Sequence, residues 1–235
     1  MPSTLCPPRN TSGPSVRPRW RRRFLRLALG FAAVLAIGNL LIVGASVLAK
    51  TTAPSSAVDV PDAVSGIRNF EAVDATLWRG GAPTSDDYRA LAAAGVTTVV
   101  DLRAEANLQV PDRLIERLGM TRVAIPIRDG QTPTDEQVQR FLDAADSSEG
   151  TLYLHCGAGV GRTGTMTAVY RVSHGGGGWS AMRANLAVGP PSLEQLAYAA
   201  ALDRGEAIGH PNGAVVAVSR TLDAPRRIFH ALDLL

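Results

Sequence analysis

The stretch LYLHCGAGVGRTG, residues 152–164, constrains the fold of this chain more than any other feature of its sequence. The apolar run TLYLH (151–155) is typical of a buried strand, and a glycine-rich loop separates it from a helix expected over about 162–173. A strand, a short loop and a helix in this order are the repeating unit of α/β domains. In such domains a ligand binds beyond the carboxyl end of a strand, which is where Cys156 stands.

The segments around this stretch repeat the alternation of strands and helices. Strands are expected at 96–102 and 121–127, and helices at 85–95, 113–119, 179–187 and 192–203. Thr134, followed three residues later by Gln137, predicts the capped start of a further helix. The pattern predicts an α/β fold class: a three-layer domain with a mostly parallel central sheet flanked by helices, plus one N-terminal transmembrane helix.

The transmembrane helix is expected at residues 27–49, which carry no charge and only two polar side chains, Asn39 and Ser46. Its 23 residues would span roughly 35 Å as a helix, enough to cross a bilayer. The arginine cluster before it should stay cytoplasmic and place the rest of the chain outside. The sequence around Ala49 also fits a signal-peptidase site, so cleavage and secretion are the alternative.

The charges are unevenly distributed along the chain. Residues 1–50 contain seven arginines and Lys50 but no acid, so residues 51–235 hold 16 of the 24 basic residues and all 21 acidic ones. The part of the chain after the apolar run is therefore acidic, by about five charges. The sequence thus argues against a nucleic-acid partner.

The glycines after Cys156 leave backbone N–H groups free to converge on an anion at the start of a helix. Arg162 adds a planar guanidinium that can hold two oxygens of one phosphate. The same donors would stabilise a thiolate and make Cys156 nucleophilic. A phosphate ester and a cysteine nucleophile therefore require the same loop.

Other interpretations of this loop fit less well. GVGRTG (159–164) satisfies the G-x-G-x-x-G pattern of dinucleotide sites, but no acid occurs between Glu149 and Glu194. A nucleotide-binding loop of the Walker type needs a lysine, and Lys50 is the only one. His155 and Cys156 lack partners at metal-ligand spacing, so no metal and no cofactor are expected. A structural cysteine in a glycine turn remains an alternative.

The segment HCGAGVGRTG resembles the phosphate-binding loop of the cysteine-dependent protein tyrosine and dual-specificity phosphatase superfamily, with its H-C-x5-R-[ST] signature. The resemblance extends over about residues 76–203 and is nearest to small bacterial members. It includes the segments LWRGGAPT (77–84), VVDLR (99–103) and IPIRDGQTPT (125–134). The alanine- and arginine-rich composition also favours a bacterial origin.

The resemblance implies a two-step hydrolysis in which Cys156 attacks phosphorus and forms a phosphocysteine. Arg162 and the loop N–H groups would hold the equatorial oxygens. His155 would orient the loop and help keep the thiol ionised, and the Thr163 hydroxyl would stabilise the departing thiolate. The implied phosphate-binding residues are Gly157, Ala158, Gly159, Val160, Gly161 and Arg162.

The general acid is expected to be Asp129, because the family places an aspartate on the loop after the strand that precedes the cysteine strand. A turn or helix-cap carboxylate is the alternative role for this residue. Asp135 and Glu136 are runners-up, although their place in the first turn of a helix already accounts for them. Gln195 is a candidate for the water-positioning glutamine of some members.

The sequence therefore predicts a phosphoric monoester hydrolase, of the tyrosine or dual-specificity protein phosphatase type. The alternatives are a phosphatase of a small phosphomonoester or inositol phosphate, since the loop also resembles that of the cysteine phytases, and a non-catalytic phosphate-binding module. The expected partners are a phosphorylated protein or a small phosphomonoester, and a membrane through the N-terminal helix.

Five segments are expected along the chain: a basic cytoplasmic tail (1–26), a transmembrane anchor or signal segment (27–49), a flexible linker (50–65), a phosphatase-like catalytic domain (66–210) and a C-terminal extension (211–235). The small, polar and proline-bearing composition of 51–65 indicates the linker. The protein would be a single-pass membrane protein with its catalytic domain extracytoplasmic.

Overall fold

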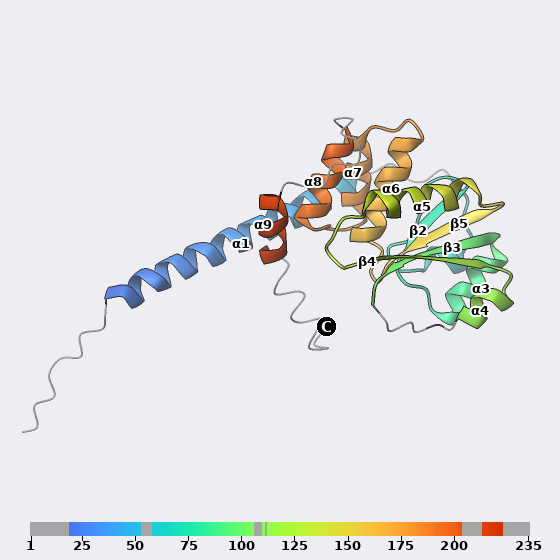
Figure 1. The fold of residues 1–235 in the computed structure, drawn as a ribbon, viewed down its shortest axis with the longest axis horizontal. Coiled ribbons are helices and arrows are strands. Elements are labelled where there is room, and N and C mark those ends of the chain that lie inside the picture. The colour runs from blue at the N-terminus through green and yellow to red at the C-terminus, as the bar shows by residue number, and fades with distance from the viewer. Residues whose placement is uncertain (1–18, 53–57, 106–109, 111, 204–212, 223–235) are drawn as a thin grey trace, which may run out of the picture. The chain divides into compact units, whose positions relative to one another are not determined.

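The computed structural model describes residues 19–52, 58–105, 110, 112–203 and 213–222. The chain divides into two units, Met1–Gly38 and Asn39–Leu235. Most of the expected tail and most of the expected C-terminal extension lie outside the described residues. The elements, labelled in Figure 1, are α1 (Arg19–Thr52), α2 (Asp62–Ser65), β1 (Glu71–Ala72), β2 (Leu77–Gly80), α3 (Ser85–Ala93), β3 (Val96–Arg103), α4 (Asp112–Arg117), β4 (Thr121–Ile127), α5 (Asp135–Asp146), β5 (Thr151–His155), α6 (Gly161–Ser173), α7 (Gly178–Val188), α8 (Leu193–Asp203) and α9 (Gly213–Leu222).

The central sheet has five strands in the order β1-β2-β5-β3-β4, and the expected mostly parallel sheet is confirmed. Strands β2, β5, β3 and β4 run parallel, and the short β1 pairs antiparallel with β2. In this register His155 lies opposite Gly80 on one side and Asp101 on the other. The carboxyl ends of the parallel strands therefore meet at one edge, and Cys156 follows the central strand there.

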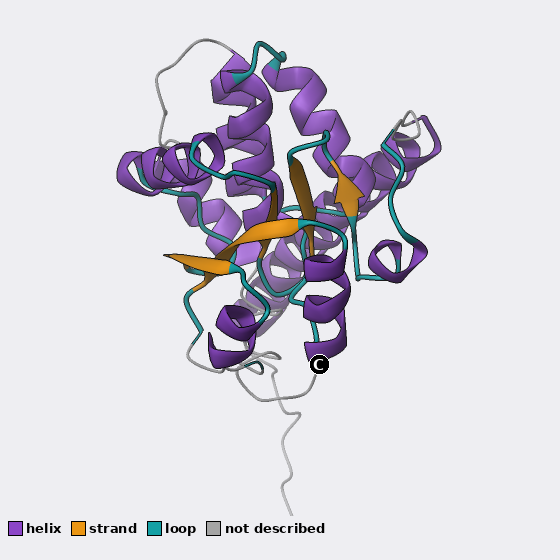
Figure 2. Ribbon diagram, turned by 90° about the vertical axis from the view of Figure 1, so that its right-hand side faces the viewer, coloured by secondary structure: helices purple, strands orange, loops and turns teal. Residues whose placement is uncertain are grey.

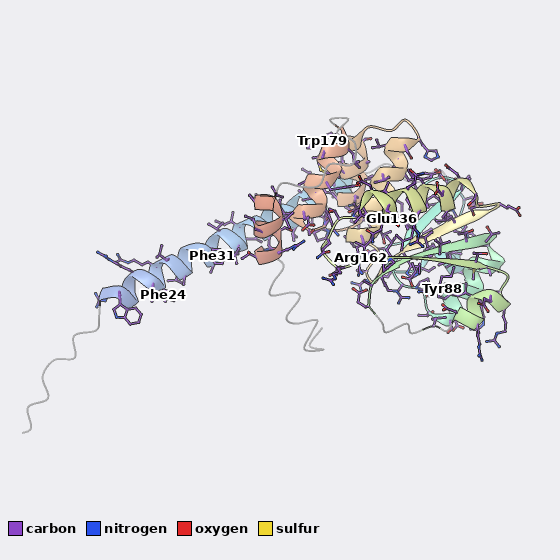
Figure 3. All side chains as sticks on the ribbon, viewed as in Figure 1. Phe24, Phe31, Tyr88, Glu136, Arg162 and Trp179 are labelled. Carbon is purple, nitrogen blue, oxygen red and sulfur yellow. The ribbon has the colours of Figure 1, made fainter. Side chains whose placement is uncertain are left out.

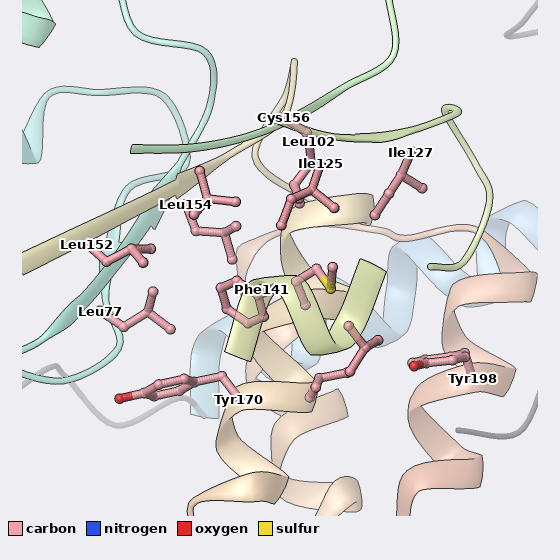
Figure 4. Close-up of a cluster of buried hydrophobic side chains, with 14 residues drawn as sticks. Leu77, Leu102, Ile125, Ile127, Phe141, Leu152, Leu154, Cys156, Tyr170 and Tyr198 are labelled. Atoms are coloured by element: carbon pink, nitrogen blue, oxygen red, sulfur yellow. The ribbon is translucent and has the colours of Figure 1, made fainter. Parts of the chain in front are cut away.

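Helices cover both faces of the sheet, which gives the three expected layers (Figure 2). On one face, strand residues such as Leu154 and Ile125 pack against Phe141 of α5 and Met166 of α6, with Cys156 at the end of this cluster (Figure 4). On the other face, α2, α3 and α4 contribute a second cluster of buried residues, among them Val64, Leu91 and Ile115. The central strands β3 and β5 are therefore buried on both faces, with Val99, Val100, Tyr153 and Leu154 all at 0% exposure.

Several elements differ from those expected. The segment expected to be a flexible linker contains α2, and its Val64 is fully buried in the core, so the ordered domain begins before residue 66. The strands β1 and β2 and the helix α9 were not predicted as such. Thr134 and Gln137 do form the predicted capping box of α5.

The N-terminal helix α1 includes the stretch Arg22–Thr52, which is long and apolar enough to cross a membrane. A signal sequence near an N-terminus meets the same criteria of length and composition. The expected helix over 27–49 lies within α1.

Candidate active site

Cys156 is the first residue after β5 and begins the loop that leads into α6; residues 156–162 are called the phosphate loop below. The thiol is buried, and the Gly159 N–H donates a hydrogen bond to Sγ over 3.3 Å. Gly159 has a φ of 77°, the left-handed region that glycine adopts without strain. The loop thus wraps its backbone around the sulfur just before the amino end of α6, where helix dipoles favour negative charge.

The carbonyl groups of residues 157–159 are all bound by residues of the surrounding scaffold. They accept hydrogen bonds from Ala82 N (3.0 Å), Asn69 Nδ2 (2.8 Å) and Arg79 Nη2 (2.7 Å), respectively. In a trans peptide the N–H group points opposite to the carbonyl. Fixing these three carbonyls outward therefore turns the following N–H groups toward the centre of the loop, where an anion would bind.

Arg162 lies in the first turn of α6 with its guanidinium buried. Nη1 donates to the Ile127 carbonyl (3.0 Å) and to both Glu105 carboxylate oxygens (3.0 and 2.9 Å), while Nη2 lies 3.4 Å from Asp129 Oδ1. Nε is buried and has no hydrogen-bond partner among the described residues. One edge of the guanidinium is therefore anchored, and the Nε edge keeps a donor for a ligand.

Burial alone would lower the pKa of Arg162, but the Cys156 thiolate, Glu105 and Asp129 together raise it above the ordinary value. The guanidinium is therefore permanently charged. Its two carboxylate partners are about half exposed, at 50% and 42%. Ion pairs of this exposure are weak, so a phosphate dianion can compete for the same donors.

Asp129 stands in the turn after β4, and the start of α8 holds this turn in place. Ser192 Oγ donates to the Gly130 carbonyl (3.0 Å), and Gln195 Nε2 donates to the Gln131 carbonyl (3.3 Å). Asp129, the candidate general acid, thus lies beside Arg162, with its Oδ1 3.4 Å from Nη2.

The two runners-up, Asp135 and Glu136, are exposed in the first turn of α5, where acidic side chains stabilise the helix N-terminus (Glu136 is labelled in Figure 3). Gln195, the candidate water-positioning residue, packs against Gly161 of the phosphate loop. The role of each remains a prediction.

His155 is fully buried at the end of β5. Its Nδ1 lies 3.2 Å from the Cys156 carbonyl oxygen, and its Nε2 lies 3.3 Å from the Tyr88 hydroxyl. Burial lowers the pKa of His155 to about 4, although the nearby Asp101 carboxylate acts in the opposite direction. The imidazole is therefore neutral near pH 7, and it can orient the loop by hydrogen bonding but adds no positive charge to the thiolate.

Thr163 is fully buried, and its hydroxyl has no hydrogen-bond partner in the part of the chain that the structure describes. A buried hydroxyl normally finds a partner. The predicted role, donation to the thiolate as it leaves phosphorus, would supply one.

The glycines of GVGRTG make room for specific neighbours. A Cβ at Gly159 would collide with the backbone at the end of β2, one at Gly161 with the Gln195 amide, and one at Gly164 with the Asn185 amide. The G-x-G-x-x-G pattern thus follows from close packing around the phosphate loop.

Several residues that contact the site had not been singled out from the sequence, among them Arg79, Asn69 and Glu105. Arg79 lies within the LWRGGAPT segment, so the family resemblance pointed to its neighbourhood. Asn69, with a φ of 54°, and Glu105 gave no comparable signal. Among the described residues, no group of three or more His, Cys, Asp or Glu side chains is arranged to hold a metal ion.

The parallel sheet and the H-C-x5-R-T loop at its carboxyl edge define the protein tyrosine and dual-specificity phosphatase superfamily. Within it, residues 56–199, more than half of the chain, match the family described as "DSP-PTPase phosphatase fused to NAD+ Kinase", and the chain belongs to this family.

Curated relatives match over shorter stretches. Human "Dual specificity protein phosphatase CDC14C" is 54% identical over 46 residues, which are 20% of this chain and 10% of that protein. "Probable NAD kinase 2, chloroplastic" from Oryza sativa subsp. japonica is 32% identical over 108 residues, 42% of this chain and 11% of that protein. The matches thus cover about a tenth of the length of these relatives.

Two solved structures share the fold. The core catalytic domain of the PP-IP phosphatase SIW14 from S. cerevisiae has a TM-score of 0.53 at 14% identity, covering 60% of this chain and 88% of that one. PTPMT1 has a TM-score of 0.50 at 20% identity, covering 58% and 95%. At these identities the likeness concerns the fold alone.

Proposed function

We propose that this chain hydrolyses phosphoric monoesters through a phosphocysteine intermediate. The arrangement of the phosphate loop carries the proposal: a buried thiol that accepts the Gly159 N–H, beside a guanidinium whose Nε has no partner among the described residues. Outward-bound carbonyls direct further N–H groups to the same point. A thiolate nucleophile and a phosphate cradle therefore occupy one loop.

In the first step the Cys156 thiolate attacks phosphorus opposite the ester oxygen. The S–P bond forms as the bond between phosphorus and the leaving oxygen breaks, and Asp129 gives that oxygen its proton. Arg162 and the loop N–H groups hold the three equatorial oxygens, where charge is spread in the transition state. A phosphate bound to the guanidinium would take the place of the half-exposed Asp129 carboxyl there and leave this carboxyl beside the leaving group.

In the second step a water molecule attacks the phosphocysteine. Asp129, now a carboxylate, takes a proton from the water as the new P–O bond forms and the S–P bond breaks. The departing thiolate accepts hydrogen bonds from the Thr163 hydroxyl and the Gly159 N–H. Inorganic phosphate leaves, and the thiolate is ready for another cycle.

The proposed substrate is a phosphorylated protein. Residues 157–161 carry no charged side chain, which suits a single phosphate group better than a polyphosphorylated inositol ring. Similarity to proteins named dual specificity protein phosphatases supports the same choice. A small phosphomonoester would use the same loop.

We also propose on which side of a membrane the catalytic domain lies. The apolar helix α1, with arginines before it and an acidic domain after it, supports a single-pass anchor that places the catalytic domain outside the cytoplasm. A phosphatase reporter and a cytoplasmic fluorescent reporter, each fused after Leu235, test this. Activity of the exported reporter supports the proposed orientation, and fluorescence of the other contradicts it.

The activity is tested with p-nitrophenyl phosphate and with an alkyl phosphate, using the full-length chain in detergent micelles, beside Cys156→Ser and Asp129→Ala. Cys156→Ser should abolish turnover, and Asp129→Ala should lower kcat by about 10²-fold on an alkyl phosphate, which needs a general acid most. Glu136→Ala is the matched control for a nearby exposed carboxylate and should leave kcat unchanged. Full turnover by Cys156→Ser would contradict the mechanism.

A further inference from the structure

Arg79 of β2 is the largest fully buried side chain of the described residues, with 1% of its surface exposed. Its Nη2 donates to the Gly159 carbonyl (2.7 Å), and both Nη atoms lie 3.3 Å from Asn185 Oδ1 of α7. The Val160 carbonyl oxygen lies 3.5 Å from the same Nη2 atom. The guanidinium therefore sits behind the phosphate loop, on the side opposite to an incoming phosphate.

A buried arginine is costly to a fold, because its charge is removed from water and an arginine cannot lose its proton in a protein. Its carboxylate neighbour, Glu71, is its cross-strand partner at a separation of 3.7 Å, too long for a hydrogen bond. Nε has no hydrogen-bond partner among the described residues. The positive charge is thus only partly compensated within the scaffold.

Arg79 is also linked to the nucleophile. Burial lowers the pKa of Arg79, whereas the negative charges of Glu71 and of the Cys156 thiolate raise it. Gly159, whose carbonyl accepts from Arg79 Nη2, also donates its N–H to Cys156 Sγ, so Arg79 holds the residue that binds the nucleophile.

We propose that Arg79 is a positioning residue for the phosphate loop. It fixes the Gly159 carbonyl outward, so that the N–H of residue 160 faces the phosphate, and it stabilises the Cys156 thiolate from the buried side. This inference rests on the proposed function. Asn185 holds the guanidinium in this orientation. The Asn185 amide itself packs against Gly164, so the amide has no room to turn away from Arg79.

The chain offers a matched control in Arg171 of α6. Its Nη2 pairs with the other oxygen of the same Glu71, at 2.7 Å, but no contact with the phosphate loop is recorded for it. Arg171→Met therefore removes an arginine from the same carboxylate without touching the loop. Arg79→Lys keeps the charge but lacks the planar fork that binds Gly159 and Asn185 together.

The test measures two properties that need no turnover, in the full-length chain in detergent micelles. One is the rate of Cys156 alkylation by iodoacetamide at pH 6, which reports the thiolate fraction. The other is protection of Cys156 from alkylation by inorganic phosphate. Arg79→Met should lower the alkylation rate and weaken phosphate protection, each by about tenfold, the effect of one charge-assisted hydrogen bond.

Arg79→Lys should recover most of the alkylation rate but little of the phosphate protection, because charge and geometry are then separated. Asn185→Ala should weaken phosphate protection by about threefold, and Arg171→Met should change neither property. If Arg79 had a purely structural role, these variants would lower the melting temperature, but they would not affect the alkylation rate and the phosphate protection to different extents.

Unchanged alkylation and unchanged phosphate protection in folded Arg79→Met overturn the proposal. If Arg79→Met does not fold, Arg79→Lys and Asn185→Ala test the proposal instead. It is overturned if both of these variants show the phosphate protection and alkylation rate of the unmutated chain. If the unmutated chain does not turn over p-nitrophenyl phosphate, only the proposed function is contradicted. The alkylation and phosphate-protection assays need no turnover and still test the role of Arg79.

Discussion

The phosphate loop has two sides that are built differently. On its open side, Arg162 is held by Glu105 and Asp129, whose carboxylates are about half exposed. On its buried side, Arg79, Asn185 and His155 are all at least 95% buried. Exposed ion pairs are weak and exchangeable, whereas buried hydrogen bonds of charged groups are costly to break. The open side is thus suited to exchange carboxylates for a phosphate, and the buried side to keep the loop in one shape.

The largest effect is expected from Arg162, the group through which the open side meets the substrate. Arg162→Lys keeps the charge but loses the Nε donor and the planar geometry. We expect kcat/KM for p-nitrophenyl phosphate to fall by about 10²–10³-fold, the cost of removing one preorganised donor from a transition state. Steady-state kinetics measure it, and Arg128→Lys, an exposed arginine near Asp129 in sequence, is the control. A loss of less than about threefold would show that the guanidinium does not bind the phosphate.

The residues on the buried side should affect how the stability of the fold depends on pH. The pKa of His155 is lowered from 6.5 to about 4 by burial. The unfolded chain therefore binds a proton below pH 6.5 that the folded protein rejects until about pH 4, so stability falls as the pH decreases through this window. Between pH 7 and pH 5 the loss should be about 1–2 kcal/mol.

Urea unfolding at pH 7 and pH 5 measures this loss, with His155→Gln as the comparison. The variant should be less stable at pH 7 but should lose less stability on acidification. Asp101, whose pKa is also lowered, by hydrogen bonds from Arg103 and Arg122 that outweigh the opposing effect of burial, adds its own loss only below about pH 4. An identical loss between pH 7 and pH 5 in both proteins would show that His155 is not the group that titrates.

The smallest effect is expected from Glu105, on the open side. Glu105→Gln removes the charge that faces Arg162 Nη1 but leaves the Ile127 carbonyl as its anchor. Because the carboxylate is 50% exposed, we expect kcat/KM to change by no more than about threefold, with reduced sensitivity to salt. A loss as large as that of Arg162→Lys would mean that the two sides of the loop do not differ as described.

Much of the fold and the centre of the site could be predicted from local sequence. The strand at 151–155 and the strand at 121–127 have the predicted bounds, because each is a short segment rich in apolar residues with a glycine shortly before it and another shortly after it. The Cys156 loop could be recognised because thiol, glycines and arginine lie within seven residues. Such features depend on neighbours in the chain.

The parts that were missed depend on contacts between distant residues. Arg79 stands on a strand of four residues, and arginine is normally exposed, so nothing local marks it as buried. Glu105 meets Arg162 across 57 positions, and Asn185 meets Arg79 across 106. The order of the strands, which places β2 and β3 on either side of β5, creates these contacts, and local patterns do not encode that order.

The central claim is a phosphoryl group carried by Cys156, and trapping it is the most direct test. Asp129→Asn, mixed with p-nitrophenyl phosphate and quenched in acid, should accumulate the intermediate, because an aryl leaving group needs little proton transfer whereas the water step has lost its base. Peptide mapping by mass spectrometry should then find one phosphoryl group on Cys156 and none in Cys156→Ser. Turnover that proceeds with the phosphoryl group on another residue, or with none on Cys156 at any time point, would contradict the account.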